Sequence, residues 1–142
     1  MSKTYISAAL RGWVSDRANH ACEYCLIPEI AVLAPLEIDH IVAEKHGGKT
    51  TKDNLALSCS ICNKHKGSDI ASIDPKSGDI VRLYHPRRDN WPDHFRLETE
   101  SEIYPLTPIG RVTTTLLQIN QPNRIREREL LNQAGVINVP MG

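Results

Sequence analysis

Several features are missing from this sequence of 142 residues, and their absence limits what the protein can be. No run approaches the roughly 18 uninterrupted apolar residues of a membrane span, and the first residues lack a basic-then-apolar signal pattern. We therefore expect a cytoplasmic protein with no membrane partner. Lysine plus arginine and aspartate plus glutamate both total 17, so net charge gives no argument for a polyanionic partner. Internal repeats and low-complexity tracts are also missing.

What is present indicates an ordinary globular protein. Hydrophobic residues make up 40% of the chain and charged residues 24%, which is typical of a folded domain with a core. The length suits one compact domain and is too short to divide comfortably into two. We therefore expect residues 1–142 to form a single domain.

The pattern of apolar residues predicts a mixture of helices and strands. Apolar residues recur every three or four positions over residues 7–19, which predicts an amphipathic helix. Alternation at residues 36–42 predicts a strand that carries Asp39 and His40. The remaining expected elements are a surface loop over 43–53, an apolar run at 55–57 that pairs back with that strand, a helix beginning at Asn63, a strand at 80–84, and two helices after Pro108 separated at 120–122.

The cysteines form two Cys-x-x-Cys pairs, Cys22 with Cys25 and Cys59 with Cys62. Each short interval lets a tight turn aim both sulfurs at one point, and two such turns complete a tetrahedral zinc shell. A site closed by four thiolates leaves no position for water, so this zinc would be structural. Two disulfides are the alternative, which a cytosolic location disfavours, and four free thiols are another, which the paired spacing disfavours.

Residue types that suit a hydrolytic metal site lie between and just after these pairs. Asp39 offers a carboxylate oxygen and Asn63 an amide carbonyl oxygen, and such ligands suit Mg²⁺ or Mn²⁺. His40 could take a proton from water. Taken singly, each residue has a structural explanation: Asn54 suits a turn, and Lys66 suits a solvated surface. It is their combination that predicts chemistry.

The segment from Cys22 to Asp69 resembles the HNH endonuclease family. The resemblance rests on the motifs Cys22-Glu-Tyr-Cys25, Glu37-Ile-Asp-His40, His46-Gly-Gly48, Asn54-Leu-Ala-Leu-Ser-Cys59 and Cys62-Asn-Lys-His-Lys-Gly67. It implies an α+β fold with a small ββα-metal, treble-clef-like core at residues 22–69, stabilised by the four-cysteine zinc. An N-terminal helix and a C-terminal extension of strands and helices at residues 80–142 would flank this core.

The resemblance also implies an activity, the metal-dependent hydrolysis of phosphodiester bonds in DNA. His40 corresponds to the general base that activates water, and Asp39 would bind the catalytic cation. Asn54 corresponds to the family's middle asparagine, which braces the loop that positions the histidine. Asn63 stands where many members have histidine, and would be the second ligand of the cation. This departure leaves the preference between Mg²⁺ and Mn²⁺ open.

Other charged residues are weaker candidates. Lys66 could approach phosphate and offset charge in the transition state, and His65 is an alternative metal ligand or nucleic-acid contact. Arg87 and Arg88 could bind backbone phosphates. Equally, the aromatic residues near these arginines could pack against the core while the arginines pair with acidic neighbours. Alternating charges at residues 124–129 predict an exposed helix surface.

Two rival functions remain open: a non-catalytic zinc module that binds nucleic acid, and a protein-interaction domain that zinc merely stabilises. Neither gives a reason for Asp39, His40 and Asn63 to occur together. RNA remains open as a substrate, and nothing in the sequence indicates sequence specificity, biological role or oligomeric state.

Overall fold

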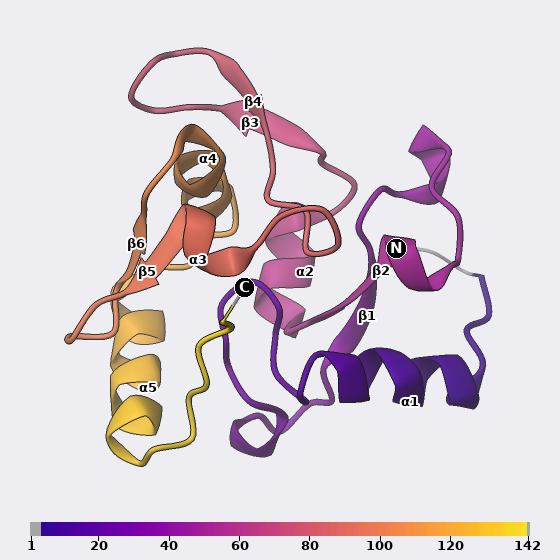
Figure 1. Cartoon of the computed structure of the whole chain (residues 1–142), viewed down its shortest axis with the longest axis horizontal. Helices are drawn as coiled ribbons and strands as arrows, with labels where there is room; N and C mark the ends of the chain where they lie inside the picture. The colour runs from indigo at the N-terminus through magenta and orange to yellow at the C-terminus, as the bar shows by residue number, and fades with distance from the viewer. Residues whose placement is uncertain (1–3, 142) are drawn as a thin grey trace.

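The computed structural model describes residues 4–141 and has an α+β architecture (Figure 1). Short helices alternate with three separate two-stranded antiparallel sheets. The α-helices are α1 (Ala8–Arg17), α2 (Ser60–Lys66), α3 (Trp91–His94), α4 (Pro108–Leu116) and α5 (Pro122–Gln133). The strands are β1 (Glu37–His40), β2 (Leu55–Ser58), β3 (Ala71–Ile73), β4 (Ile80–Arg82), β5 (Phe95–Leu97) and β6 (Ile103–Pro105). Three-residue 3₁₀ turns occur at Glu29–Ala31, Glu44–His46 and Lys52–Asn54.

The centre of the molecule is a β-hairpin followed directly by a helix. β1 pairs antiparallel with β2, so that Asp39 faces Ala56 and His40 faces Leu55. All four residues of β2 are buried, which anchors the hairpin in the core. The predicted strand, the loop after it and the return pairing at residues 55–57 are therefore confirmed.

Helix α2 begins earlier than expected. The sequence predicted a start at Asn63, but the helix begins at Ser60, with Cys59 as its N-cap. The Cys59 sulfur accepts a hydrogen bond from the Cys62 backbone N–H at 3.4 Å, which satisfies one of the free donors of the first turn. Cys62 and Asn63 therefore both lie within the helix.

Helix α1 confirms the helix predicted at residues 7–19. The Ser7 hydroxyl caps it by accepting the Leu10 N–H at 3.1 Å, and Val14 is fully buried. Not every apolar position of this segment faces the core, because Ala9 is exposed and Trp13 remains 43% exposed. The Arg17 guanidinium and the Lys52 ammonium lie over its ring, 4.7 and 4.3 Å from the centroid.

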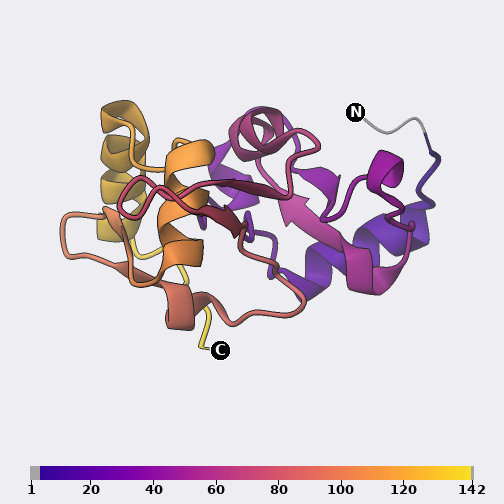
Figure 2. The same cartoon turned by 90° about the horizontal axis from the view of Figure 1, so that it is seen from above.

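The C-terminal extension packs against the hairpin and α2 at the end of the molecule opposite α1 (Figures 1 and 2). Figures 1 and 2 show α1 and α5 at opposite ends of an elongated molecule, with α2 between them. Trp91 and Phe95 are each 2% exposed, and the Trp91 indole N–H donates to the Tyr24 carbonyl at 3.1 Å. The aromatic residues of this segment therefore belong to the core, as the structural alternative proposed. The predicted strand at 80–84 and the two helices after Pro108 are also confirmed.

The charged stretch in α5 is not the exposed surface that its sequence predicted. Arg126 is exposed, but Arg124 and Arg128 are only 7% and 3% exposed. Their spacing of four residues places both on the inward face of the helix. Within residues 4–141, no helix is both long enough and apolar enough to cross a membrane.

Candidate metal centres and active site

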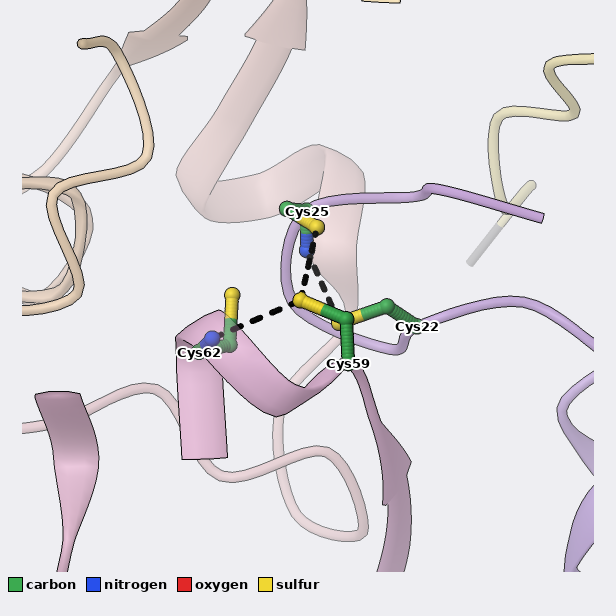
Figure 3. A group of neighbouring side chains, drawn as sticks. All are labelled: Cys22, Cys25, Cys59 and Cys62. Atoms are coloured by element: carbon green, nitrogen blue, oxygen red, sulfur yellow. Dashed lines mark hydrogen bonds between the residues drawn. The ribbon is translucent and has the colours of Figure 1, made fainter. Parts of the chain in front are cut away.

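The four cysteines come together in one buried cluster, as the paired spacing predicted. Their sulfurs lie within 4.8 Å of one another, and the Cys25 and Cys59 sulfurs are 3.6 Å apart. Zinc–sulfur bonds of about 2.3 Å in a tetrahedron place sulfurs about 3.8 Å apart, so the cluster fits a four-thiolate zinc. Figure 3 shows one pair arriving from the loop after α1 and the other from the start of α2.

Backbone hydrogen bonds shape both cysteine turns. The Cys25 N–H points at the Cys22 sulfur at 3.5 Å, and the Cys62 N–H points at the Cys59 sulfur at 3.4 Å. In each pair the second residue thus turns back over the first, which brings both side chains to the same side. Zinc in this cluster would join the loop after α1 to α2, the helix that carries Asn63.

Asp39 lies at the centre of a second, polar cluster. Its side chain is 4% exposed, and it accepts a hydrogen bond from the Tyr24 hydroxyl at 2.8 Å. The Lys66 ammonium lies 3.3 Å from one carboxylate oxygen and 3.2 Å from the other. Burial raises the pKa of Asp39 above its usual value, although the contacts with Lys66 and Tyr24 act in the opposite direction.

Lys66 does not lie where a phosphate could reach it, which contradicts the expectation that it approaches substrate. The residue is 2% exposed. Besides Asp39, its ammonium donates to the carbonyl oxygens of His40 at 3.2 Å and Ile41 at 3.0 Å. These partners hold the charge inside the protein, against the end of β1.

Asn63 also contacts β1, but at a different residue. Its amide nitrogen donates to the Glu37 carboxylate at 2.6 Å. Glu37 and Asp39 are two positions apart on one strand, so their side chains share a face, about 7 Å apart along the strand. Among residues 4–141 no direct hydrogen bond joins Asp39 to Asn63, although α2 brings both Asn63 and Lys66 to the same face.

His40 is held by the loop that follows its strand. Its ring nitrogen Nε2 lies 2.9 Å from the Thr50 hydroxyl oxygen, and the residue is 8% exposed. Among residues 4–141 the other ring nitrogen, Nδ1, has no hydrogen-bond partner. If Nε2 carries the proton and donates to Thr50, Nδ1 is free to accept a proton.

Asn54 closes this loop. Its side-chain carbonyl accepts the Val42 N–H at 2.9 Å, and its amide donates to the carbonyl oxygens of Val42 at 2.9 Å and Lys49 at 2.8 Å. Gly48 allows the close approach that this requires, because a Cβ there would lie 1.7 Å from the Val42 carbonyl oxygen. Asn54 therefore makes the bracing contacts that the resemblance assigned to it.

The weaker candidates have separate environments. The His65 ring nitrogen Nδ1 lies 3.4 Å from the side-chain nitrogen of Gln118. Arg87 forms a largely buried ion pair with Glu23, as the structural alternative proposed. Arg88 is exposed and is the one of these candidates that stays open to a phosphate contact.

Several residues that contact the candidate site residues were not predicted from the sequence. Glu37 begins the motif Glu37-Ile-Asp-His40, and its position two residues before Asp39 is the signal that places it on the same strand face. The contacts of Tyr24, Thr50 and Arg124 join segments far apart in the chain, and no local spacing marked them.

Residues 22–69 match a family model described as HNH endonuclease. The match contains both cysteine pairs, β1, β2 and α2, and it leaves the C-terminal extension outside. Comparison with curated proteins and with solved structures gave no match.

Proposed function

Because residues 22–69 match a family model described as HNH endonuclease, we propose that this protein is an endonuclease that hydrolyses phosphodiester bonds in DNA with the help of Mg²⁺ or Mn²⁺. The proposal treats residues 1–142 as one domain, with the nuclease core at 22–69 and an extension at 80–142. In it, Asp39 and Asn63 bind the cation, and the four cysteines hold a structural zinc.

One observation supports the proposal: two of the three proposed functional groups lie on one strand, and the third contacts that strand. His40 ends β1 and Asp39 precedes it, while the Asn63 amide on α2 donates a hydrogen bond to Glu37, on the face of β1 that carries Asp39. Because side chains alternate along a strand, the proposed proton acceptor His40 and the proposed cation ligand Asp39 point to opposite faces of β1. Hydrolysis needs both a group that takes a proton from water and a group that binds the cation.

His40 would act as the general base. In this role the Thr50 hydroxyl oxygen accepts a hydrogen bond from the Nε2–H group, so Nδ1 is the nitrogen that takes a proton from the attacking water. Asn54 fixes the loop that carries Thr50, and so holds the imidazole in one orientation. A bound divalent cation would supply Lewis-acid stabilisation for the charge that develops on the phosphate and the leaving 3′ oxygen.

Asp39 keeps capacity for a cation despite its internal partners. An ionised carboxylate offers about four lone-pair positions, and Tyr24 and Lys66 use three of them. A cation held at about 2.1 Å by two oxygens brings those oxygens within about 4 Å of each other. The Asn63 side chain would therefore turn from Glu37 toward Asp39 when the cation binds.

The basic residues that would meet the DNA backbone are the exposed ones near the hairpin. Lys45, Lys49 and Lys52 lie on the loop that holds His40, and Lys64 lies on α2. Backbone contacts of this kind give affinity that falls with salt and does not depend on base sequence.

The buried pair of Lys66 and Asp39 favours a second candidate function, a zinc module that binds nucleic acid without cutting it. An ammonium that stays within 3.3 Å of Asp39 supplies the positive charge that a catalytic cation would bring. This candidate predicts DNA binding with no cleavage in any metal.

Nicking of supercoiled plasmid in Mg²⁺, in Mn²⁺ and in EDTA tests the proposal. The nuclease cuts in the first two conditions, and His40→Ala lowers the rate by about 10²–10⁴ because the general base is gone. His20→Ala is the matched control, since the His20 side chain is 54% exposed and lies in the turn after α1. Cleavage that persists in His40→Ala, or no cleavage by the parent at equal zinc content, rejects the proposal.

A further inference from the structure

Helix α5 packs against the rest of the protein through buried arginines instead of buried apolar residues. Of its twelve residues, the buried ones are Arg124 and Arg128, and neither is apolar. Burial of an apolar stripe normally holds a surface helix in place. Something other than apolar contact must therefore offset the cost of removing two guanidinium groups from water.

Arg124 reaches the cysteine cluster directly. Its Nη2 lies 3.1 Å from the Cys62 sulfur and 3.7 Å from the Cys59 sulfur. Its Nη1 donates to the carbonyl oxygens of Leu117 at 2.8 Å and Gln118 at 3.1 Å, which fixes the direction of the guanidinium. The arginine therefore faces two of the four proposed zinc ligands.

Arg128 lies one turn further along the same helix face. It donates to the carbonyl oxygens of Ser101 at 2.8 Å and Ile119 at 3.2 Å, and to the Asn120 side chain at 3.1 Å. These partners are neutral. Arg128 and Arg124 line the same cavity as Cys25 and Cys59.

Neither arginine has a carboxylate counterion. Among residues 4–141, no ion pair within 4.0 Å involves Arg124 or Arg128, whereas Arg82, Arg87, Arg96 and Arg111 each have one. Buried charges are normally paired. Glu127 lines the same cavity but forms no ion pair with either arginine within 4.0 Å, whereas Arg124 contacts the cysteine sulfurs directly. Four thiols are neutral, but four thiolates around one Zn²⁺ carry a net charge of −2. Two guanidinium groups carry +2.

We propose that the two buried arginines of α5 are the counterions of the zinc centre, so that zinc binding docks α5 onto the core and the docked helix retains the zinc. The Arg124 N–H groups donate to thiolate sulfur and reduce the charge that the metal and its ligands expose. This role is independent of the proposed nuclease activity, and it links a segment outside the family match to the centre of the core.

The rate of zinc release into a chromogenic chelator tests the proposal on the full chain. Arg124→Gln releases zinc about 10–100-fold faster than the parent, the range expected when a partner of a metal ligand is lost. Arg126→Gln is the matched control, because Arg126 lies on the exposed face of the same helix. Arg124→Lys keeps the charge and recovers part of the retention.

Two further readouts separate this role from simple packing. In cobalt-substituted protein, the sulfur-to-metal charge-transfer absorption of Arg124→Gln shifts to lower energy, because the thiolate has lost a hydrogen bond. In the parent, hydrogen exchange of the Pro122–Gln133 amides accelerates when zinc is removed. If Arg124→Gln does not fold, the cobalt spectrum and zinc release of Arg124→Lys take its place. The proposal is overturned if Arg124→Gln releases zinc at the same rate as Arg126→Gln and has the same cobalt spectrum. It is also overturned if hydrogen exchange in α5 does not change when zinc is removed.

Discussion

The buried contact between Lys66 and Asp39 makes the sharpest prediction about stability. Lys66→Met removes the ammonium but keeps much of the side-chain volume, so it leaves Asp39 at 4% exposure with Tyr24 as its remaining partner. The carbonyl oxygens of His40 and Ile41 lose a donor as well. Breaking a buried ion pair on one side costs about 3–5 kcal/mol. For a chain of this size that lowers Tm by roughly 10 °C or more.

The loss of stability in Lys66→Met should also depend on pH. Burial already raises the pKa of Asp39, and removal of Lys66 raises it further, because the ammonium acted to lower it. A carboxyl whose pKa is higher in the folded state than in the unfolded state stabilises the fold below its unfolded pKa of about 3.9, and this contribution is lost as pH rises through the folded pKa. The stability gap between Lys66→Met and the parent is therefore wider at neutral pH and narrows as pH falls toward the unfolded pKa of about 3.9.

Thermal and urea unfolding of matched variants check this prediction. Lys64→Met is the control, because Lys64 is exposed on the same helix and its loss should stay within about 0.5 kcal/mol. Adding Asp39→Asn to Lys66→Met restores part of the stability, since no buried charge is then left unpaired. If Lys66→Met is as stable as Lys64→Met yet loses cleavage, Lys66 acts on substrate, and its structural role is refuted.

Three other predictions concern the loop and the zinc. Asn54→Ala removes three hydrogen bonds and lowers the free energy of unfolding by about 2–3 kcal/mol; urea unfolding beside Asn123→Ala, an exposed control, would show no difference if the loop were not braced. Thr50→Val lowers kcat of plasmid nicking and leaves KM unchanged, because it frees the His40 ring to rotate. Thr50→Ser keeps the hydroxyl and restores the rate, and a change in KM alone would contradict this explanation. Removal of zinc by a strong chelator unfolds the segment between the cysteine pairs, because the cluster joins the loop after α1 to α2; an unchanged circular dichroism spectrum and melting curve would argue against a structural zinc.

The parts of the site that were predictable from the sequence depend on short-range rules. Within each Cys-x-x-Cys pair, the two-residue interval suits a tight turn that aims both sulfurs at one point, and two such pairs complete one zinc shell. Alternation predicted the strand that carries Asp39 and His40, and the brief apolar run at residues 55–57 predicted the return pairing. Proline at 108 and 122 marked the starts of the last two helices.

The errors share one physical cause. Lys66 and the arginines of α5 were expected at the surface because charged side chains are seldom buried without partners. Their partners lie far away in the chain: Asp39 is 27 positions from Lys66, and Cys62 is 62 positions from Arg124. No window of local sequence contains both members of such a pair. The fold decides the burial of these residues, and their spacing does not reveal it.

The central claim is that Asp39 and Asn63 hold one catalytic cation beside His40. Electron paramagnetic resonance of Mn²⁺, titrated into zinc-loaded protein with a phosphorothioate DNA duplex that resists cleavage, measures this directly. We predict one bound Mn²⁺ per chain, weakened at least tenfold in Asn63→Ala and unchanged in the exposed control Asn123→Ala. A spectrum of free Mn²⁺ throughout the titration, with zinc still bound, would contradict the claim and leave a zinc module in which Lys66 permanently neutralises Asp39.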